Sequence, residues 1–303
     1  MSRVAYLGPR GTFSQAALIE MSARGMLPGT ADEVDTVSTP AALDAVRDGG
    51  AEYACVPIEN SIEGSVLPTL DSLAFGPALQ IFGELTLDVA FSIVVAADKA
   101  ASDVRTVAAF PVAAAQVRRW LAAELPNAAI VPAISNAAAA EDVLGGRADA
   151  GVSTALAAEL YGLDTLATDV VDEPNARTRF VLVGPPGRPP QRTGADRTSV
   201  VLRLDNTPGA LVAAMTELAV RDIDLTRIES RPTRTELGTY VFFLDCVGHI
   251  DDGPVAEALT ALHRRCADVR YLGSWPTDAP AGAVPPTTDE ASTWLARLRE
   301  GTR

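Results

Sequence analysis

The sequence predicts an α/β protein whose first part forms two lobes with a cleft between them and whose second part is a ferredoxin-like βαββαβ domain. Over the first 185 residues, short β-rich runs alternate with alanine-rich runs of helical character, and the alternation falls into two comparable sets. Residues 184–197 then carry four prolines and three glycines with hardly any apolar residue, which indicates a linker. A cleft between two lobes is the usual place for a small-ligand site.

The two lobes are predicted from strands and helices that alternate along the chain. In the first lobe the expected strands are residues 3–7, 34–38 and 53–58, and the expected helices are residues 14–23, 40–48 and 65–75. In the second lobe the expected strands are residues 91–97, 106–110, 128–134 and 148–154, and the expected helices are residues 111–125, 135–146 and 155–162. A returning segment at 164–184 ends in the strand TRFVLVG.

The pattern beyond the linker is shorter and predicts a βαββαβ unit. Its expected elements are strand 198–204, helix 208–220, strand 224–230, turn 231–238, strand 239–248, helix 255–266 and strand 269–275. Residues 276–290 have the composition of a disordered spacer, and residues 291–300 predict one amphipathic helix. The predicted domains are therefore 1–186, a linker at 187–197, 198–276, and a tail at 277–303.

The charge balance excludes several classes of partner. With 39 acidic and 25 basic residues, the formal charge is -14, the wrong sign for a surface that must neutralise phosphates. The most apolar run, residues 89–97, is too short to span a bilayer, and the first residues lack the regions of an export signal. We therefore expect a cytoplasmic protein that binds neither nucleic acid nor membrane.

The rare residues exclude most cofactor chemistry. Lys99 is the only lysine and lies in a segment that resembles neither a pyridoxal site nor a phosphate-binding loop. The three cysteines are widely separated, which argues against a zinc site and fits reduced thiols. Both histidines lie in the last quarter of the chain, so a histidine-based triad is not expected in the lobes. We expect neither a metal nor an organic cofactor.

The first candidate segment is LGPRGTFS, residues 7–14, where a strand ends and a helix begins. Gly11 frees the backbone, and Thr12 with the first N–H groups of the helix forms a rim that suits an anion. Taken alone, the segment is more typical of a tight turn with a capped helix than of an anion site.

The second candidate segment is VPIENSIEGSV, residues 56–66, where a buried strand delivers Glu59, Asn60 and Ser61 to one turn. The alternative interpretation is that Asn60 and Ser61 cap the next helix and Glu59 is solvated. A similar turn in the second lobe, residues 134–140, presents Ser135 and Asn136, which are either ligand-binding or helix-capping residues.

The third candidate segment is NARTRF, residues 175–180, at the entry to a hydrophobic strand. Arg179 has the planar fork that fits a carboxylate, and its alternative role is an ion pair that stabilises the lobe. Thr178 offers a hydroxyl next to the aromatic side chain of Phe180.

In order and spacing, these segments resemble prephenate dehydratase, the family that converts prephenate to phenylpyruvate. LGPRGTFS is similar to the opening motif of that family, VPIENSIEGSV to its ENSxxG segment and NARTRF to its TRF motif. The resemblance implies a periplasmic-binding-protein-like catalytic domain in its monofunctional form and a threonine, here Thr178, that is needed for dehydration. One departure is Phe110, which stands where many members carry a histidine.

The second domain resembles the ACT domain with which that family is regulated. NTPGALV, residues 206–212, is similar to its GALV motif, and IESRP, residues 228–232, to its ESRP motif. The resemblance implies phenylalanine binding between subunits of a dimer or tetramer, with IESRP supplied by the neighbouring chain. The implied effector-site residues are Asn206, Gly209, Ala210, Leu211, Val212, Glu229, Ser230, Arg231 and Pro232.

The chemistry of prephenate assigns expected roles. Loss of carbon dioxide and hydroxide makes the ring aromatic, so the protein must supply a donor for the leaving hydroxide and positive potential for a carboxylate. We expect Thr178 to be the donor, with Glu59 as the alternative acid. We expect Arg179 and N–H groups near Gly11, Thr12, Ser61 and Ser135 to hold the substrate, together with Asn60 and Asn136, and Phe13 and Phe180 to form an apolar wall.

Two other functions fit the same pattern. Arogenate dehydratase shares these motifs and this chemistry, and a two-lobed α/β body also suits a non-catalytic small-ligand sensor. An assay with both substrates distinguishes the three possibilities.

Overall fold

The computed structural model describes residues 1–236, 238–278, 282–284 and 289–302. The chain divides into two compact units, and each unit is built from two separate stretches of sequence. The first unit comprises Met1–Leu70 and Leu85–Val181, and the second comprises Asp71–Glu84 and Leu182–Arg303. This division differs from the single boundary expected near residue 186, because a short stretch of the first sequence domain belongs to the second unit.

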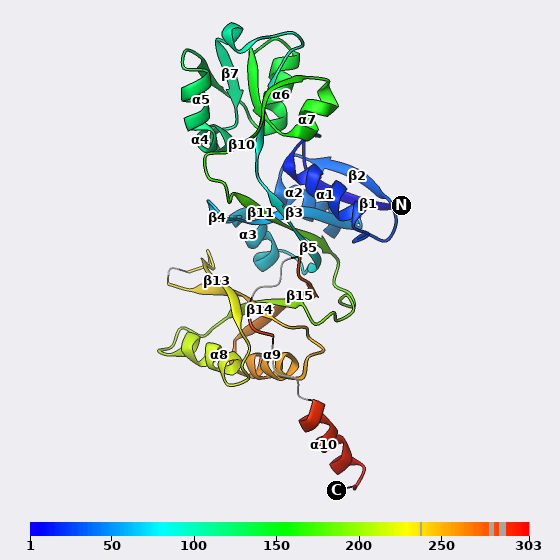
Figure 1. Ribbon diagram of the computed structural model, residues 1–303. Coiled ribbons are helices and arrows are strands. Elements are labelled where there is room, and N and C mark those ends of the chain that lie inside the picture. Colours follow the sequence, from blue (N-terminus) through cyan, green and yellow to red (C-terminus); the bar gives the residue numbers. More distant parts are fainter. Residues whose placement is uncertain (237, 279–281, 285–288, 303) are drawn as a thin grey trace. The chain divides into compact units, whose positions relative to one another are not determined.

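The first lobe is an α/β sheet of six strands (Figure 1). Its strands are β1 Ser2–Leu7, β2 Ala31–Thr36, β3 Tyr53–Asn60, β4 Gly64–Ser65, β5 Gln80–Asp88 and β11 Arg177–Gly184, in the order β2-β1-β3-β11-β5 with β4 paired to β3. Its helices are α1 Phe13–Ala23, α2 Thr39–Arg47 and α3 Leu67–Phe75. Strand β1 pairs in parallel with both β2 and β3, and helices α1 and α2 connect these strands, as the alternating pattern predicts.

The second lobe contains a separate sheet of five strands. Its strands are β6 Phe91–Val95, β7 Thr106–Ala109, β8 Ala129–Pro132, β9 Ala150–Ser153 and β10 Asp164–Val170, in the order β10-β6-β9-β7-β8. Its helices are the 3-10 turn Ala101–Asp103 and α4 Pro111–Gln116, α5 Arg118–Glu124, α6 Asn136–Leu144 and α7 Ala155–Tyr161. The core of this lobe is apolar and includes Ile93, Val107 and Leu121. The expected two-lobed arrangement is confirmed.

The helix expected over residues 111–125 is broken in two at Val117, where φ is -121° and ψ is 13°. The break has a specific cause in Asp172. Its N–H donates to the carbonyl of Gln116 over 2.6 Å, and its carboxylate accepts from the N–H of Arg119 over 2.9 Å. These are backbone groups that an unbroken helix would pair within itself, so the Asp172 contacts replace one turn of helical bonding.

Two connections join the lobes (Figure 1). One runs from β5 to β6 through Val89, and the other runs from β10 to β11 through residues 171–176. The N–H of Val89 donates to the carbonyl of Ala176 over 2.7 Å, so the two connections are tied together. Because the second connection leads directly into β11, it also places Arg177, Thr178 and Arg179.

The C-terminal domain is an antiparallel sheet with two helices. Its strands are β12 Asp196–Arg203, β13 Leu225–Pro232, β14 Tyr240–Val247 and β15 Asp268–Pro276, in the order β13-β14-β12-β15. Helices α8 Ala210–Ala219 and α9 Gly253–Arg265 pack on the sheet through a shared apolar core that includes Leu202, Leu218 and Leu262. The expected βαββαβ order is confirmed. The turn expected from residue 231 begins later, because Arg231 and Pro232 still pair with β14.

The start of β5 is bound into the second unit by a buried charge. Glu84 is 3% exposed and accepts from Arg197 Nη1 and from Trp275 Nε1, each over 3.0 Å. At Gly273, a Cβ would lie 2.3 Å from the carbonyl oxygen of Ile81, so the backbones of β15 and β5 approach as closely as only glycine permits. These contacts explain why residues 71–84 belong to the second unit.

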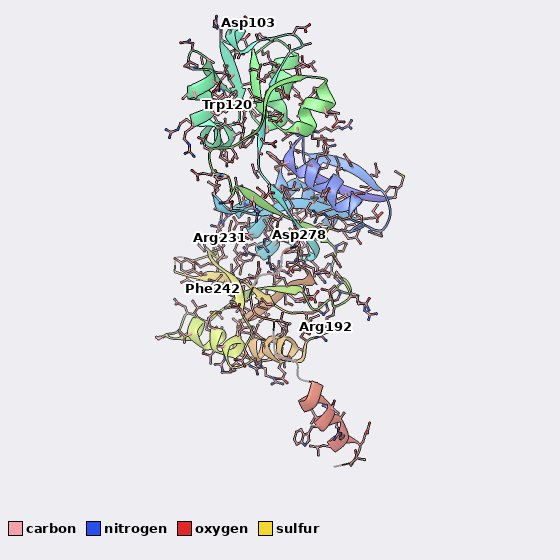
Figure 2. All side chains as sticks on the ribbon, viewed as in Figure 1. Asp103, Trp120, Arg192, Arg231, Phe242 and Asp278 are labelled. Carbon is pink, nitrogen blue, oxygen red and sulfur yellow. The ribbon has the colours of Figure 1, made fainter. Side chains whose placement is uncertain are left out.

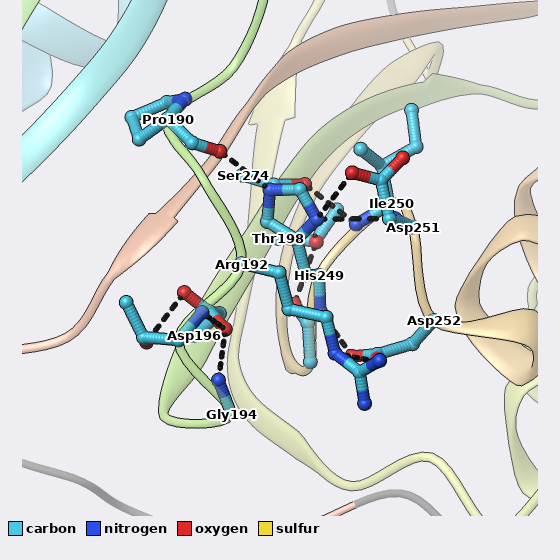
Figure 3. A network of polar contacts seen from close by, with 12 residues as sticks. Pro190, Arg192, Gly194, Asp196, Thr198, His249, Ile250, Asp251, Asp252 and Ser274 are labelled. Atoms are coloured by element: carbon cyan, nitrogen blue, oxygen red, sulfur yellow. Dashed lines mark hydrogen bonds and ion pairs between the residues drawn. The ribbon is translucent and has the colours of Figure 1, made fainter. Parts of the chain in front are cut away.

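The expected linker is fastened along its length (Figure 3). Nε2 of the fully buried His249 lies 3.1 Å from the carbonyl oxygen of Pro190, and its Nδ1 accepts from the N–H of Asp251 over 3.1 Å. Arg192 forms a 2.6 Å ion pair with Asp252. The linker is therefore held against the second unit by specific contacts, although its composition is that of a loop.

The expected spacer at 276–290 lies partly outside the described residues, which exclude 279–281 and 285–288. The helix expected at 291–300 is present as α10 Asp289–Arg299. Among the helices in the described ranges, none is long and apolar enough to cross a membrane.

Candidate active site

Asn60 and Thr178 form the centre of the candidate site. Asn60 is the last residue of β3 and Thr178 the second residue of β11, which is the neighbour of β3 in the sheet. Asn60 Nδ2 donates to Thr178 Oγ1 over 2.9 Å. Thr178 is 8% exposed, so this contact is largely protected from solvent. The ENS and TRF segments are thus brought together.

The orientation of the Asn60 amide follows from its other contacts. Its Oδ1 accepts from the N–H of Ile62 over 2.8 Å and from the N–H of Glu63 over 3.1 Å. These two backbone donors require an oxygen, so the NH₂ group must face Thr178. Because the NH₂ group can only donate, the hydroxyl of Thr178 accepts from it and keeps its own proton for another acceptor.

Ser61 fixes the register of the two segments. Its N–H donates to the carbonyl of Arg177 over 2.8 Å, and its hydroxyl accepts from the N–H of Arg177 over 2.8 Å and donates to the carbonyl of Asn175 over 3.1 Å. The expected role of the Ser61 N–H as a donor to substrate therefore requires correction, because this N–H is already engaged by the TRF segment.

Glu59 and Arg179 form an ion pair next to this centre. Arg179 Nη2 lies 2.9 Å from Glu59 Oε2, and the side chains are 9% and 41% exposed, respectively. The alternative weighed for Arg179, a stabilising ion pair, is therefore present. The contact gives Glu59 the role of an acceptor for Arg179, which favours Thr178 over Glu59 as the donor.

Gly11 and Thr12 shape the start of α1. Thr12 is the N-cap of the helix, accepts from the N–H of Gln15 over 3.4 Å and donates to the carbonyl of Leu7 over 2.9 Å. The N–H of Gly11 donates to Gln15 Oε1 over 2.5 Å, so this donor is engaged within the chain, contrary to its expected role. Gln15, which the sequence analysis did not single out, is 3% exposed and holds this turn.

The same turn touches the second lobe. Gly11 has a φ of 86°, and a Cβ on it would lie 2.9 Å from the Cβ of Ala157 and 3.5 Å from the Cβ of Ala137. The carbonyl of Gly11 accepts from Thr154 Oγ1 over 2.6 Å. The first turns of α1, α6 and α7 thus meet at a point where only hydrogen fits as a side chain.

Phe13 also crosses to the second lobe. Its ring packs edge-on against Phe91 with centroids 5.6 Å apart, and it borders the apolar core of that lobe together with Phe110. Phe180, in contrast, is 2% exposed and belongs to the buried interior. The predicted wall of Phe13 and Phe180 needs correction, because Phe180 presents almost no surface to a ligand.

Ser135 and Asn136 begin α6 in different ways. Ser135 is the N-cap and accepts from the N–H of Ala138 over 3.0 Å, which is the helix-capping alternative. Asn136 Oδ1 is buried and has no hydrogen-bond partner among the described residues. A buried oxygen without a partner is costly, so this atom is suited to receive a donor from a ligand.

The residues of the GALV motif lie in a pocket of the second unit. A cavity of about 770 Å³ is lined by Asn206, Gly209, Ala210, Leu211 and Val212, and also by Arg203, Tyr240, Phe242 and Arg270. Ala74 and Phe75, at the end of α3, line the same cavity. Their presence there has no local signal in the sequence, because nothing in SVLPTLDSLAF points to the second domain.

The ESRP residues lie on β13, outside the set that lines this cavity. All four pair along β14, and the side chain of Arg231, which is labelled in Figure 2, also contacts Asp71 on α3. Both Nε and Nη2 of Arg231 donate to the carboxylate of Asp71, over 2.9 to 3.0 Å. Arg234 donates to the same carboxylate.

The described part of the chain contains no cluster of three His, Cys, Asp or Glu side chains that could hold a metal ion. Gln116, for which the sequence carries no local signal, is 7% exposed, and its Oε1 lacks a partner among the described residues.

The fold and this site define an enzyme class in which a two-lobed α/β catalytic body is joined to a small βαββαβ regulatory domain. The prephenate dehydratase family matches residues 4–188, and the ACT domain family matches residues 198–264. A prephenate dehydratase from Mycobacterium sp. (strain JLS) is 75% identical over 307 residues, covering 99% of this chain and 97% of the relative. The chain belongs to the prephenate dehydratase family.

Solved structures agree in fold. The prephenate dehydratase from Arthrobacter aurescens in complex with L-Phe is 40% identical, with a TM-score of 0.87 over 98% of this chain and 99% of that chain. A protein described as a novel type of quorum quenching acylase, GqqA, is 31% identical, with a TM-score of 0.80 over 91% of this chain and 98% of that chain. The architecture expected from the sequence, two lobes followed by an ACT domain, is thus confirmed.

Proposed function

We propose that the chain is a carbon-oxygen lyase that converts prephenate to phenylpyruvate, carbon dioxide and water in the cytoplasm, without a metal or organic cofactor. Aromatisation of the ring supplies the driving force. The protein must assist the departure of a poor leaving group, hydroxide, and hold a dianion in place.

The Asn60–Thr178 hydrogen bond carries the proposal. Since Asn60 donates to Thr178 Oγ1, the hydroxyl proton of Thr178 is directed away from Asn60 and toward a ligand. As the ring hydroxyl leaves, it gains negative charge and becomes a stronger acceptor for this proton. The contact therefore strengthens in the transition state, which is the condition for a catalytic effect. A free alcohol is a weak acid, so Thr178 acts as a hydrogen-bond donor or relay.

The substrate carboxylates need positive potential that a chain of charge -14 does not supply globally. We assign this role to the first turns of α1 and α6, which approach each other at Gly11 and Ala137. Helix N-termini attract anions through their unpaired N–H groups and the helix dipole. Asn136 Oδ1, which lacks a protein partner in the described structure, is then available to a hydroxyl of the substrate.

The Glu59–Arg179 pair has a supporting role in this mechanism. Arg179 is 9% exposed in its side chain and remains charged, so it adds positive potential beside Thr178 even while bound to Glu59. Glu59 holds the guanidinium in place. If a carboxylate of the substrate bound Arg179 directly, the guanidinium group would have to contact both that carboxylate and Glu59.

One assay tests the reaction and the substrate together. The purified full chain is incubated with prephenate or with arogenate, and phenylpyruvate and phenylalanine are quantified separately. We expect phenylpyruvate from prephenate at a higher kcat/KM than phenylalanine from arogenate. The reverse preference would identify an arogenate dehydratase, and binding of prephenate without turnover would identify a sensor. Unchanged activity in EDTA is expected, and its loss would contradict the absence of a metal.

We further propose that phenylalanine is the allosteric inhibitor and binds in the pocket that contains the GALV residues. N–H groups at the start of α8 suit its carboxylate, and Asn206 suits its polar end. The L-Phe complex of the Arthrobacter relative supports this proposal.

We also propose that the chain forms a dimer or tetramer through the ACT domain, with the ESRP residues of one subunit facing the pocket of another. Light scattering with and without phenylalanine tests the assembly.

A further inference from the structure

Helix α3 has contacts at both ends that bear on function. Its first turn is fastened to β3 of the catalytic body. Thr69, which is fully buried, donates to the carbonyl of Pro57 over 2.5 Å, and the N–H of Val66 donates to the carbonyl of Ile58 over 2.9 Å. Between β3 and the helix, Gly64 pairs with Asn60 and Ser65 pairs with Glu59. A shift of the first turn of α3 therefore acts directly on Asn60.

The second half of α3 is fastened to the ACT domain. Asp71, with 15% of its side chain exposed, is held by Arg231 in a bidentate ion pair and also by Arg234. Arg270 Nη1 donates to the carbonyls of Leu73 and Gly76 over 2.8 and 2.7 Å, at the end of the helix. Thr69 is fully buried, and the side chains of Arg231 and Asp71 are each 15% exposed, so these contacts resist the exchange with water that weakens surface ion pairs, whereas Arg234 is exposed.

The end of α3 also enters the effector pocket. Phe75 and Ala74 line the cavity together with the GALV residues, and Phe75 is 41% exposed. An apolar amino acid bound in this cavity would therefore lie next to the aromatic ring of Phe75, a residue of the part that matches the prephenate dehydratase family. Helix α3 is therefore one continuous helix that lines the pocket, contacts the arginine of the ESRP motif and begins directly after the segment paired with Asn60.

We propose that α3 couples the effector pocket to the active site, and that Asp71 is the positioning residue through which the ACT domain holds this helix. This inference rests on the phenylalanine regulation proposed above. Occupation of the pocket changes the packing around Ala74 and Phe75, the Asp71 contacts move the helix as a unit, and its first turn alters the position of Asn60. The hydroxyl of Thr178, which depends on Asn60 for its orientation, then loses its productive direction.

The test uses the full-length chain and the variant Asp71→Asn, which removes the charge and keeps the shape of the side chain. The control is Asp44→Asn, which removes an exposed aspartate that pairs with Arg47 on α2. Three quantities are measured: turnover of prephenate, binding of L-phenylalanine by calorimetry, and the factor by which saturating phenylalanine lowers kcat/KM. Hydrogen exchange of residues 58–66 is followed with and without phenylalanine.

We expect the Asp71→Asn variant to keep its basal turnover and to bind phenylalanine with nearly unchanged affinity. The inhibition factor, about 5 to 150 for a typical coupling energy, should fall toward one, while the control variant behaves as the unmodified chain. A folded Asp71→Asn variant with the full inhibition factor would overturn the proposal.

Hydrogen exchange in the unmodified chain tests the coupling between the effector pocket and the Asn60 segment independently of the variant. Phenylalanine should change the exchange of residues 58–66 in the unmodified chain, and an unchanged exchange with phenylalanine bound would overturn the coupling even if the variant does not fold. Absence of prephenate turnover would instead overturn the proposed reaction, which the exchange measurement does not require. Absence of phenylalanine binding would overturn the proposed regulation and the coupling with it.

Discussion

The side-chain amide of Asn60 donates to the hydroxyl of Thr178 over 2.9 Å, across 118 positions of sequence. Asn60→Asp tests what this donor does. The new carboxylate can still accept from the N–H groups of Ile62 and Glu63, but it cannot donate to Thr178, whose proton it would instead attract. We expect kcat to fall about 10²-fold with KM within about tenfold, as for a group that acts mainly in the transition state. Steady-state kinetics with prephenate provide the measurement. Asn127→Asp, at an exposed position, is the control, and equal kinetics for the two variants would contradict this role.

Glu59→Gln separates the two candidates for the acid. The amide oxygen of glutamine can still accept from Arg179, while the possibility of proton donation by a carboxyl group is removed. We expect kcat to stay within about tenfold, because Thr178 remains intact. A fall of about 10² or more would assign the acid to Glu59 and contradict the role of Thr178 as the donor.

Local features of the chain could be predicted from the sequence because they have local causes. The order of strands and helices follows from apolar periodicity, and Ser38, Thr12 and Ser135 cap helices near the predicted positions. The Asn60–Thr178 contact has no such local signal. It depends on β11 returning to pair beside β3, and only the resemblance to a family placed the two segments in one site.

The features that the sequence did not predict are long-range. The break at Val117 depends on Asp172, and the burial of Phe180 depends on what packs over β11. The assignment of residues 71–84 to the second unit depends on the buried contacts of Glu84 with Arg197 and Trp275. A chain that ends near residue 186 would leave Glu84 without these partners, which is costly for a buried charge.

Gly11→Ala tests the contact between the first turns of α1 and α7. The added methyl would lie 2.9 Å from the Cβ of Ala157, and the φ of 86° is unfavourable for alanine. We expect a loss of about 1–3 kcal/mol in the free energy of unfolding, measured by denaturant titration. Adding Ala157→Gly removes the closest steric contact but leaves the Cα of residue 157 at 3.1 Å and the backbone strain, so it should restore part of the loss. Full stability of the single variant would show that the turn adapts.

Asp149→Asn tests an electrostatic contact in the second lobe through its pH dependence. The hydrogen bond from Lys99, with those from the Arg105 N–H and the Thr106 hydroxyl, holds the pKa of Asp149 well below its usual range. A lowered pKa in the folded state means that the unfolded chain binds the proton more readily. The stabilisation is therefore complete above the unfolded pKa, about 3.9, and is lost as the pH falls through the folded value.

The Tm of the unmodified chain should exceed that of the Asp149→Asn variant by a constant amount from neutral pH to about pH 5 and by less below about pH 4. Thermal unfolding monitored by circular dichroism gives both curves. Asp32→Asn, which removes an exposed partner of Arg3, is the control and should shift Tm little. A difference in Tm for Asp149→Asn that grows toward acid pH would contradict the assignment.

The hydroxyl of Thr178 is the group on which the proposed reaction depends most directly, and its test is the single-turnover rate with saturating prephenate. Thr178→Ala removes the hydroxyl, whereas Thr178→Ser keeps a hydroxyl that can accept from Asn60 and donate to the leaving group. We predict a rate about 10² to 10⁴ below that of the unmodified chain for Thr178→Ala, with most of the rate retained in Thr178→Ser and prephenate binding within about tenfold in both. A Thr178→Ala variant that forms phenylpyruvate at nearly the unmodified rate would contradict the role of this hydroxyl in the reaction.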